Sequence, residues 1–215
     1  RVLFRSSGKT ITDAREGGCS GCIEVGAFGK EAYLLTGYLN VPKVLELTLF
    51  NGIDPVTGKM VGIPTGDPGT FTSYEQMYDA FYRQLKYIID LKIRINNYID
   101  RMYAKYAPAT FLSVVMDDCI KKGRDYYNGG PRYNTTYIQC TGLATTSDSL
   151  SVLKKHVYEE KAFSMDKVLN AVARNFEGEE VLRQTIMNNT PFFGNDDDYV
   201  DSIALRVYDD LFGLI

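Results

Sequence analysis

Two cysteines and one acid in the stretch EGGCSGCIEVGAFGKEAY could do chemistry together. Cys19 and Cys22 are spaced C-x-x-C among glycines, and Glu24 follows the second cysteine by two residues. Thiols at this spacing occur in disulfides, in redox pairs and in halves of zinc sites, whereas a thiol beside a carboxylate can move a hydrogen atom and a proton. The assignment of this stretch decides most of what the sequence says about function.

Metal and dithiol chemistry fit the rest of the sequence poorly. A structural zinc site takes four ligands, usually two cysteine pairs or one pair with two histidines. The chain has four cysteines and a single histidine, His156, which we expect on an exposed helix face beside lysines. A thioredoxin-like pair opens a helix, but no helix is predicted directly after Cys22. We therefore predict no metal site, and a packed loop with both cysteines as bystanders stays open.

Cys22 and Glu24 form the better chemical pair. Alternate residues of an extended segment point to the same side, so a thiol and a carboxylate at these two positions face one space. That arrangement suits a hydrogen-atom abstractor next to a general acid/base. In the same extended geometry Cys19 points the other way.

The composition narrows the class of protein. The chain has 215 residues, of which 45% are hydrophobic, and a formal net charge of -3. That is enough for the core of one large domain or two small ones. Without a basic face we expect no nucleic-acid partner, and without a long apolar run we expect no membrane span. The scattered cysteines favour a reducing cytoplasm.

Alternating helix and strand signals predict an α/β protein. We expect a short β-capable segment at 7–12, a glycine-rich loop at 17–29, a long loop at 51–71 and a strand at 135–141. Helices are predicted in VPKVLELTLFNGID and over 73–106, 109–123, 147–161, 164–175 and 178–188. A last helix follows GNDDDYVD, whose acids we interpret as N-capping residues rather than as a calcium loop.

Several ordered motifs resemble one enzyme family. SGKTITDAREGGCSGCIEVGAFGKEAYLLTGYLNVPKVLELTLFNG resembles the active-site finger loop of glycyl radical enzymes, the group that includes pyruvate formate-lyase. GCIEVGAFGKEAY is similar to the G-C-x-E motif of its dehydratase and eliminase branches. DDCIKKGRDYYNGGPRYN, GLATTSDSLSVLKKHVYEEK, ARNFEG and GNDDDYVD follow in the family's order. The resemblance covers residues 7 to 215.

The resemblance implies a mechanism and a set of site residues. Cys22 matches the cysteine that becomes a thiyl radical and takes a hydrogen atom from the substrate, and Glu24 matches the acid/base. Cys19 matches a position without a role. Tyr38 in TGYLN is either a residue of the substrate pocket or, as we expect, a buried structural tyrosine. Arg132 is either a contact for a substrate carboxylate or, as we expect, part of a structural ion pair.

The resemblance also implies a fold and partners. The fold would be part of a ten-stranded α/β barrel with long outer helices. The radical would be stored on a glycine in an R-V-x-G-Y segment downstream of this chain, installed by a radical S-adenosylmethionine activating enzyme, in a homodimer. The motifs are most similar to those of members that dehydrate trans-4-hydroxy-L-proline. Diol dehydratases, C–N or C–S lyases, an inactive fragment and a redox or zinc module remain alternatives.

The first six residues, RVLFRS, match the translation of a common sequencing adapter. We therefore expect residues 1–6 to be foreign and residues 7–215 to be the central part of the barrel domain. On this interpretation the domain with the radical glycine lies outside the 215 residues.

Overall fold

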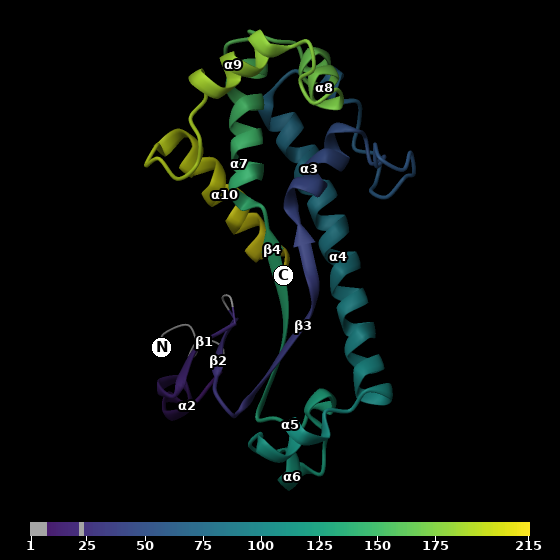
Figure 1. Cartoon of the computed structure of the whole chain (residues 1–215), viewed down its shortest axis with the longest axis vertical. Coiled ribbons are helices and arrows are strands. Elements are labelled where there is room, and N and C mark those ends of the chain that lie inside the picture. The colour runs from purple at the N-terminus through teal and green to yellow at the C-terminus, as the bar shows by residue number, and fades with distance from the viewer. Residues whose placement is uncertain (1–7, 22–23) are drawn as a thin grey trace. The chain divides into compact units, whose positions relative to one another are not determined.

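The computed structural model describes residues 8–21 and 24–215, and its described part divides into two compact units (Figure 1). The first, called here the hairpin unit, consists of Arg1–Tyr38 and Lys92–Gln139. The second, called the helical unit, consists of Leu39–Leu91 and Cys140–Ile215. Both helices and strands are present, so the prediction of an α/β protein is confirmed.

The hairpin unit begins with α2 (Ile11–Arg15), although a β-capable segment was predicted there. The reason is a cap: the Thr10 hydroxyl accepts a hydrogen bond from the Asp13 N–H and satisfies a free donor of the first turn. The glycine-rich stretch, predicted as a loop, forms the antiparallel strands β1 (Gly17–Ser20) and β2 (Glu24–Ala27). Both predictions were wrong.

Strands β3 (Glu31–Asn40) and β4 (Tyr133–Thr141) form the second two-stranded sheet. They run in the same direction, since Tyr133 N donates to Lys30 O and Thr141 Oγ1 donates to Leu39 O. The predicted strand at 135–141 is therefore confirmed. A small apolar cluster of Ala32, Leu34 and Tyr126 lies beside β3.

Short helices fill the rest of the hairpin unit. The single helix predicted over 109–123 is instead divided into α5 (Thr110–Val115) and α6 (Cys119–Lys122). The break lies at Asp118, whose φ of 75° belongs to the left-handed region and cannot continue an α-helix. A 3₁₀ turn, η2 (Tyr126–Asn128), leads into β4.

The helical unit is built from helices whose bounds largely follow the hydrophobic periodicity. They are α3 (Val41–Leu49), η1 (Pro68–Thr70), α7 (Leu143–Val152), η3 (Leu153–Glu159), α8 (Met165–Ala173), α9 (Glu180–Asn189) and α10 (Asp198–Leu214). The long helix α4 (Tyr74–Tyr106) has residues in both units. Helix α7 packs against α3 and α10, and this core buries Val44, Leu150, Val200 and Val207.

Two polar residues of the helical unit have clear structural roles. Asp197 caps α10 by accepting a hydrogen bond from Tyr199 N at 2.9 Å, as the acidic stretch predicted. His156, expected on an exposed face, is only 1% exposed. Its Nε2 lies 2.9 Å from Thr190 Oγ1 and its Nδ1 lies 3.0 Å from Glu160 Oε2. The π-helical segment η3 has a wider turn than an α-helix, which changes the face on which His156 lies.

Candidate active site

The candidate site is built on the β1–β2 hairpin. The register pairs Ser20 with Glu24, Cys19 with Val25 and Gly18 with Gly26. Side chains of residues directly opposite each other lie on the same face of an antiparallel pair. Glu24 and Ser20 therefore lie on one face, and Cys19 and Val25 lie on the other.

The Glu24 side chain folds back toward the other end of the turn. A Cβ atom added at Gly21 would lie 2.6 Å from Glu24 Oε2, so the carboxylate packs directly against the Gly21 backbone. Gly21 also has a φ of +58°, which glycine adopts without steric cost. Glycine at 21 thus leaves room for the acid at the residue that precedes Cys22 in the chain. Cys22 itself lies outside the described residues.

Cys19 is exposed, on the opposite hairpin face from Glu24. This agrees with the expectation that the two side chains point apart. Within residues 8–21 and 24–215, no group of three or more histidine, cysteine, aspartate or glutamate side chains could hold a metal ion. Cys119 and Cys140 lie elsewhere in the chain, and burial raises the pKa of both thiols.

The buried carboxylate of Glu31 binds the backbone of the β1–β2 hairpin. Glu31, at the start of β3, is 0% exposed, and its Oε2 accepts a hydrogen bond from Ala27 N at 2.8 Å. Its Oε1 accepts from Thr135 Oγ1 at 2.6 Å and pairs with Lys9 Nζ at 3.0 Å. A buried charge needs such partners, because leaving it unpaired costs several kcal/mol. A Cβ at Gly26 would lie 2.6 Å from Glu31 Oε2, so glycine is needed there too.

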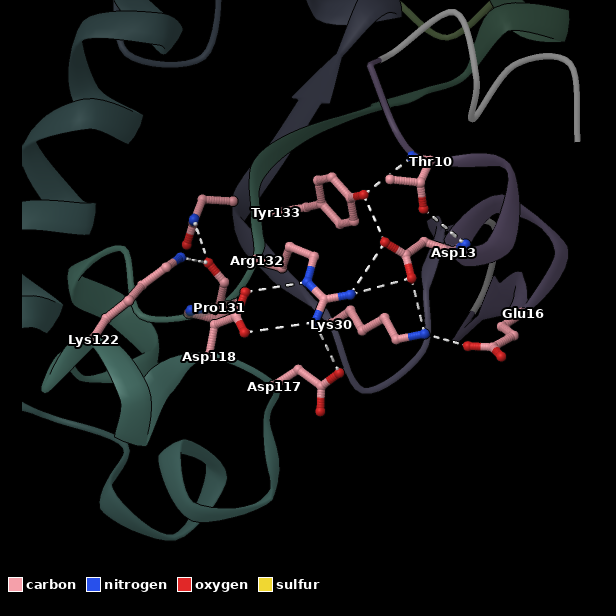
Figure 2. Close-up of polar contacts among 11 residues, drawn as sticks. Thr10, Asp13, Glu16, Lys30, Asp117, Asp118, Lys122, Pro131, Arg132 and Tyr133 are labelled. Atoms are coloured by element: carbon pink, nitrogen blue, oxygen red, sulfur yellow. Dashed lines mark hydrogen bonds and ion pairs between the residues drawn. The ribbon is translucent and has the colours of Figure 1, made fainter.

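A second polar cluster fixes the start of the hairpin (Figure 2). Asp13, 3% exposed, accepts a hydrogen bond from Tyr133 Oη at 2.7 Å and pairs with Lys30 Nζ at 2.9 Å. Lys30 also pairs with Glu16. The bonds from Lys30 and then Tyr133 hold the pKa of Asp13 well below its usual range, so Asp13 is ionised at neutral pH.

Arg132 belongs to this cluster. Its guanidinium pairs with Asp13 at 3.3 Å, Asp117 at 3.3 Å and Asp118 at 3.1 Å (Figure 2). Three carboxylates from two separate parts of the chain thus surround one arginine. The structural ion pair expected for Arg132 is confirmed, and the alternative of a contact for a substrate carboxylate has no support here.

Tyr38 lies near the end of β3 and is 60% exposed. The burial expected of a structural tyrosine is therefore not seen among the described residues. An exposed phenol is compatible with the candidate role in a pocket, and that role stays a prediction.

Sequence reasoning missed the residues that hold the hairpin, namely Asp13, Glu31, Tyr133, Thr135 and Tyr137. The stretch YNTTY places hydroxyl side chains at every second position, which in a strand means one face. That alternation was the available signal. The sequence did not show which groups those hydroxyls meet, because their partners lie about a hundred residues away.

The family model described as pyruvate formate lyase-like matches residues 1–215, and the chain belongs to this family. The chain is 54% identical over 202 residues to trans-4-hydroxy-L-proline dehydratase of Clostridioides difficile, a match that covers 94% of this chain and 26% of that protein. It is 33% identical over 198 residues to (2S)-3-sulfopropanediol dehydratase of Klebsiella oxytoca, with 91% and 24% covered.

The same similarity is found in three dimensions. The crystal structure of hydroxyproline dehydratase from Clostridioides difficile, with trans-4-hydroxy-L-proline bound, superimposes with a TM-score of 0.93 at 51% identity. The match covers 98% of this chain and 27% of that one. This confirms the predicted fold class and family. The chain spans about a quarter of the length of the relatives that it matches.

Proposed function

We propose that this chain is the finger-loop segment of a glycyl radical dehydratase. Cys22 is its hydrogen-abstracting thiol and Glu24 is its acid/base. A glycyl radical on a residue outside these 215, installed by a radical S-adenosylmethionine activating enzyme, supplies the oxidation of the Cys22 thiol. The observation that carries the proposal is the Glu24 carboxylate packed against Gly21, the residue before Cys22.

The proposed reaction is the elimination of water from trans-4-hydroxy-L-proline. The Cys22 sulfur takes a hydrogen atom from the carbon beside the one that bears the hydroxyl, which leaves a substrate radical and a thiol. Glu24 in its protonated form gives a proton to the departing hydroxyl, which leaves as water, and its carboxylate then takes a proton from the ring nitrogen, which restores the acid and leaves the product radical neutral. The product radical then takes the hydrogen atom back from the Cys22 thiol, so that the thiyl is restored and a cyclic imine results.

The choice of substrate is supported by the 54% identity to the Clostridioides difficile enzyme. Tyr38, whose phenol is exposed near the end of β3, is our candidate for a contact in the pocket. A Tyr38→Phe substitution is then expected to raise KM more than it lowers kcat, because it removes a contact present before the chemical step.

The proposal includes an activating enzyme, a small-molecule substrate, a homodimer and a cytoplasmic location. Among the helices of the described residues, none is both long and apolar enough to cross a bilayer. A second candidate function is dehydration or lysis of another small substrate by the same chemistry. The 33% identity to the sulfopropanediol dehydratase supports this second candidate. The thiol and the acid do not by themselves select the substrate.

The test uses the product of the complete reading frame that encodes this chain, activated without oxygen. Electron paramagnetic resonance measures the radical, and product analysis measures water elimination from trans-4-hydroxy-L-proline and from short diols. We expect turnover of hydroxyproline, and its loss in Cys22→Ala with the radical still present. Radical formation without turnover of any of these substrates would overturn the proposal. Turnover of a diol alone would select the second candidate.

A further inference from the structure

Among residues 8–21 and 24–215, strand β2, which carries Glu24, has one neighbouring strand. It has four residues and pairs with β1 in a two-stranded sheet. A hairpin of this size is marginally stable by itself, and the backbone groups on its open edge need partners. The contacts on that edge therefore decide where Glu24 is held.

Two side chains bind the open edge of β2. Tyr137 Oη donates a hydrogen bond to the Val25 carbonyl at 2.6 Å, and Ala27 N donates to Glu31 Oε2 at 2.8 Å. Alternate residues of a strand direct their backbone groups to the same edge, so both contacts lie on one edge. Tyr137 holds the peptide group that follows Val25, one residue beyond Glu24.

The Tyr137 ring is itself fixed. It stacks on the Tyr33 ring with centroids 5.9 Å apart and an interplanar angle of 6°. It is also the last of three hydroxyl side chains on one face of β4, here called the β4 hydroxyls: Tyr133, Thr135 and Tyr137. These donate in turn to Asp13, to Glu31 and to Val25. A fixed phenol can hold its acceptor to a fraction of an ångström, as a positioning contact requires.

The electrostatics keep this phenol protonated. Burial is the main cause that raises the pKa of Tyr137, and the negative charges of Glu31 and Glu24 raise it further. The hydroxyl therefore remains a hydrogen-bond donor throughout the neutral range.

Resting on the proposed function, we propose that Tyr137 is a positioning residue for Glu24. Its hydroxyl holds the Val25 carbonyl, fixes β2 and so holds the Glu24 carboxylate against Gly21. Tyr137 moves no proton itself. Without its hydroxyl, β2 keeps its pairing to β1 and the contact of Ala27 with Glu31, and Glu24 loses its precise placement.

The test compares two tyrosines of the stacked pair in the activated product of the complete reading frame. Tyr137→Phe removes the hydroxyl that donates to Val25 and keeps the ring. Tyr33→Phe is the matched control, because the Tyr33 hydroxyl has no hydrogen-bond partner within residues 8–21 and 24–215. We expect Tyr137→Phe to lower kcat about 10- to 100-fold with KM changed less than about threefold, and Tyr33→Phe to stay within about twofold of the parent.

If Tyr137 positions Glu24, the effects on kcat of Tyr137→Phe and Glu24→Gln should not be additive. In a Glu24→Gln background, Tyr137→Phe should have almost no further effect, because the group it positions is gone. The glycyl radical signal should equal that of the parent in all variants. A kcat for Tyr137→Phe within twofold of the parent would overturn the inference, as would full additivity with Glu24→Gln or a loss of the radical signal. If the proposed function itself is wrong, the parent protein will hold the glycyl radical and show no turnover, which distinguishes the two failures.

Discussion

The contacts inside the hairpin unit differ in kind from the contacts inside the helical unit. In the hairpin unit, buried charges are central: Asp13 and Glu31 are both nearly inaccessible and are surrounded by hydrogen-bond donors. In the helical unit, α7 packs on α3 and α10 through apolar side chains such as Leu150, Val200 and Val207.

In this chain, therefore, one kind of contact fixes the geometry of the candidate site and another kind provides folding stability. Apolar packing contributes free energy but is not directional, whereas hydrogen bonds to charged groups fix distances and angles. Glu24, the proposed acid/base, is on the hairpin, where placement matters most. We therefore expect substitutions in the hairpin unit to lower turnover, and substitutions in the helical core to lower stability.

Among the residues that the structure describes, the largest effect is expected from Glu24→Gln. Loss of a general acid/base costs typically about 10²- to 10⁴-fold in kcat, and we expect a loss in that range with little change in the unfolding midpoint. Steady-state kinetics and thermal unfolding of the activated protein measure the two quantities. A variant with normal kcat would remove Glu24 from the proposed chemistry.

Leu150→Ala is the matched test in the helical unit. Leu150 is fully buried in α7, so removing its side chain should cost about 2–5 kcal/mol of unfolding free energy through lost burial and a cavity. The kcat per folded molecule, normalised to the radical signal, should stay within about twofold of the parent. A large fall in normalised kcat with normal stability would contradict the expectation that substitutions in the helical core lower stability and not turnover.

Asp13→Asn tests the charged cluster through pH. The folded-state pKa of Asp13 lies below its unfolded value, so its stabilisation is complete above about pH 4 and is lost as the pH falls through the folded value. The difference in unfolding midpoint between the parent and Asp13→Asn should therefore be largest at neutral pH and should shrink below about pH 4. Chemical denaturation at several pH values measures it. A difference that grows toward acid would mean that the sign of the pKa change is wrong.

The smallest effect is expected from Cys19→Ser. Cys19 lies on the opposite hairpin face from Glu24, so activity should remain within about twofold of the parent. The redox and zinc alternatives both need two thiols and predict a complete loss instead. Turnover and zinc content of the purified variant decide between them.

Much of the helical unit was predictable from sequence because long helices repeat their pattern. Helix α4 continues over 33 residues, and its predicted start at residue 73 agrees with the hydrogen bond from Gln76 N to Ser73 Oγ, which caps the first turn. The hairpin was not predictable in the same way. Its glycines have no side chains to show a period of two, and the strands have only four residues each.

The candidate site was predictable in part. The chemistry predicted from the spacing of Cys22 and Glu24 stays a prediction, because Cys22 lies outside the described residues, whereas the placement of Cys19 on the opposite hairpin face from Glu24 follows from the observed register. The supporting residues were not predictable, because Glu31 meets Thr135 and Val25 meets Tyr137 only once segments about a hundred residues apart come together. His156 was misplaced for a local reason, since a π-helical turn departs from the 3.6-residue period.

The most direct test of the central claim is a chimera. Residues 8–215 would replace the matching segment of the Clostridioides difficile trans-4-hydroxy-L-proline dehydratase, and the chimera would be activated without oxygen. We predict a glycyl radical signal equal to that of the parent enzyme and water elimination from trans-4-hydroxy-L-proline that disappears in Cys22→Ala. A chimera with the full radical signal and no elimination, or with elimination that survives Cys22→Ala, would contradict the account.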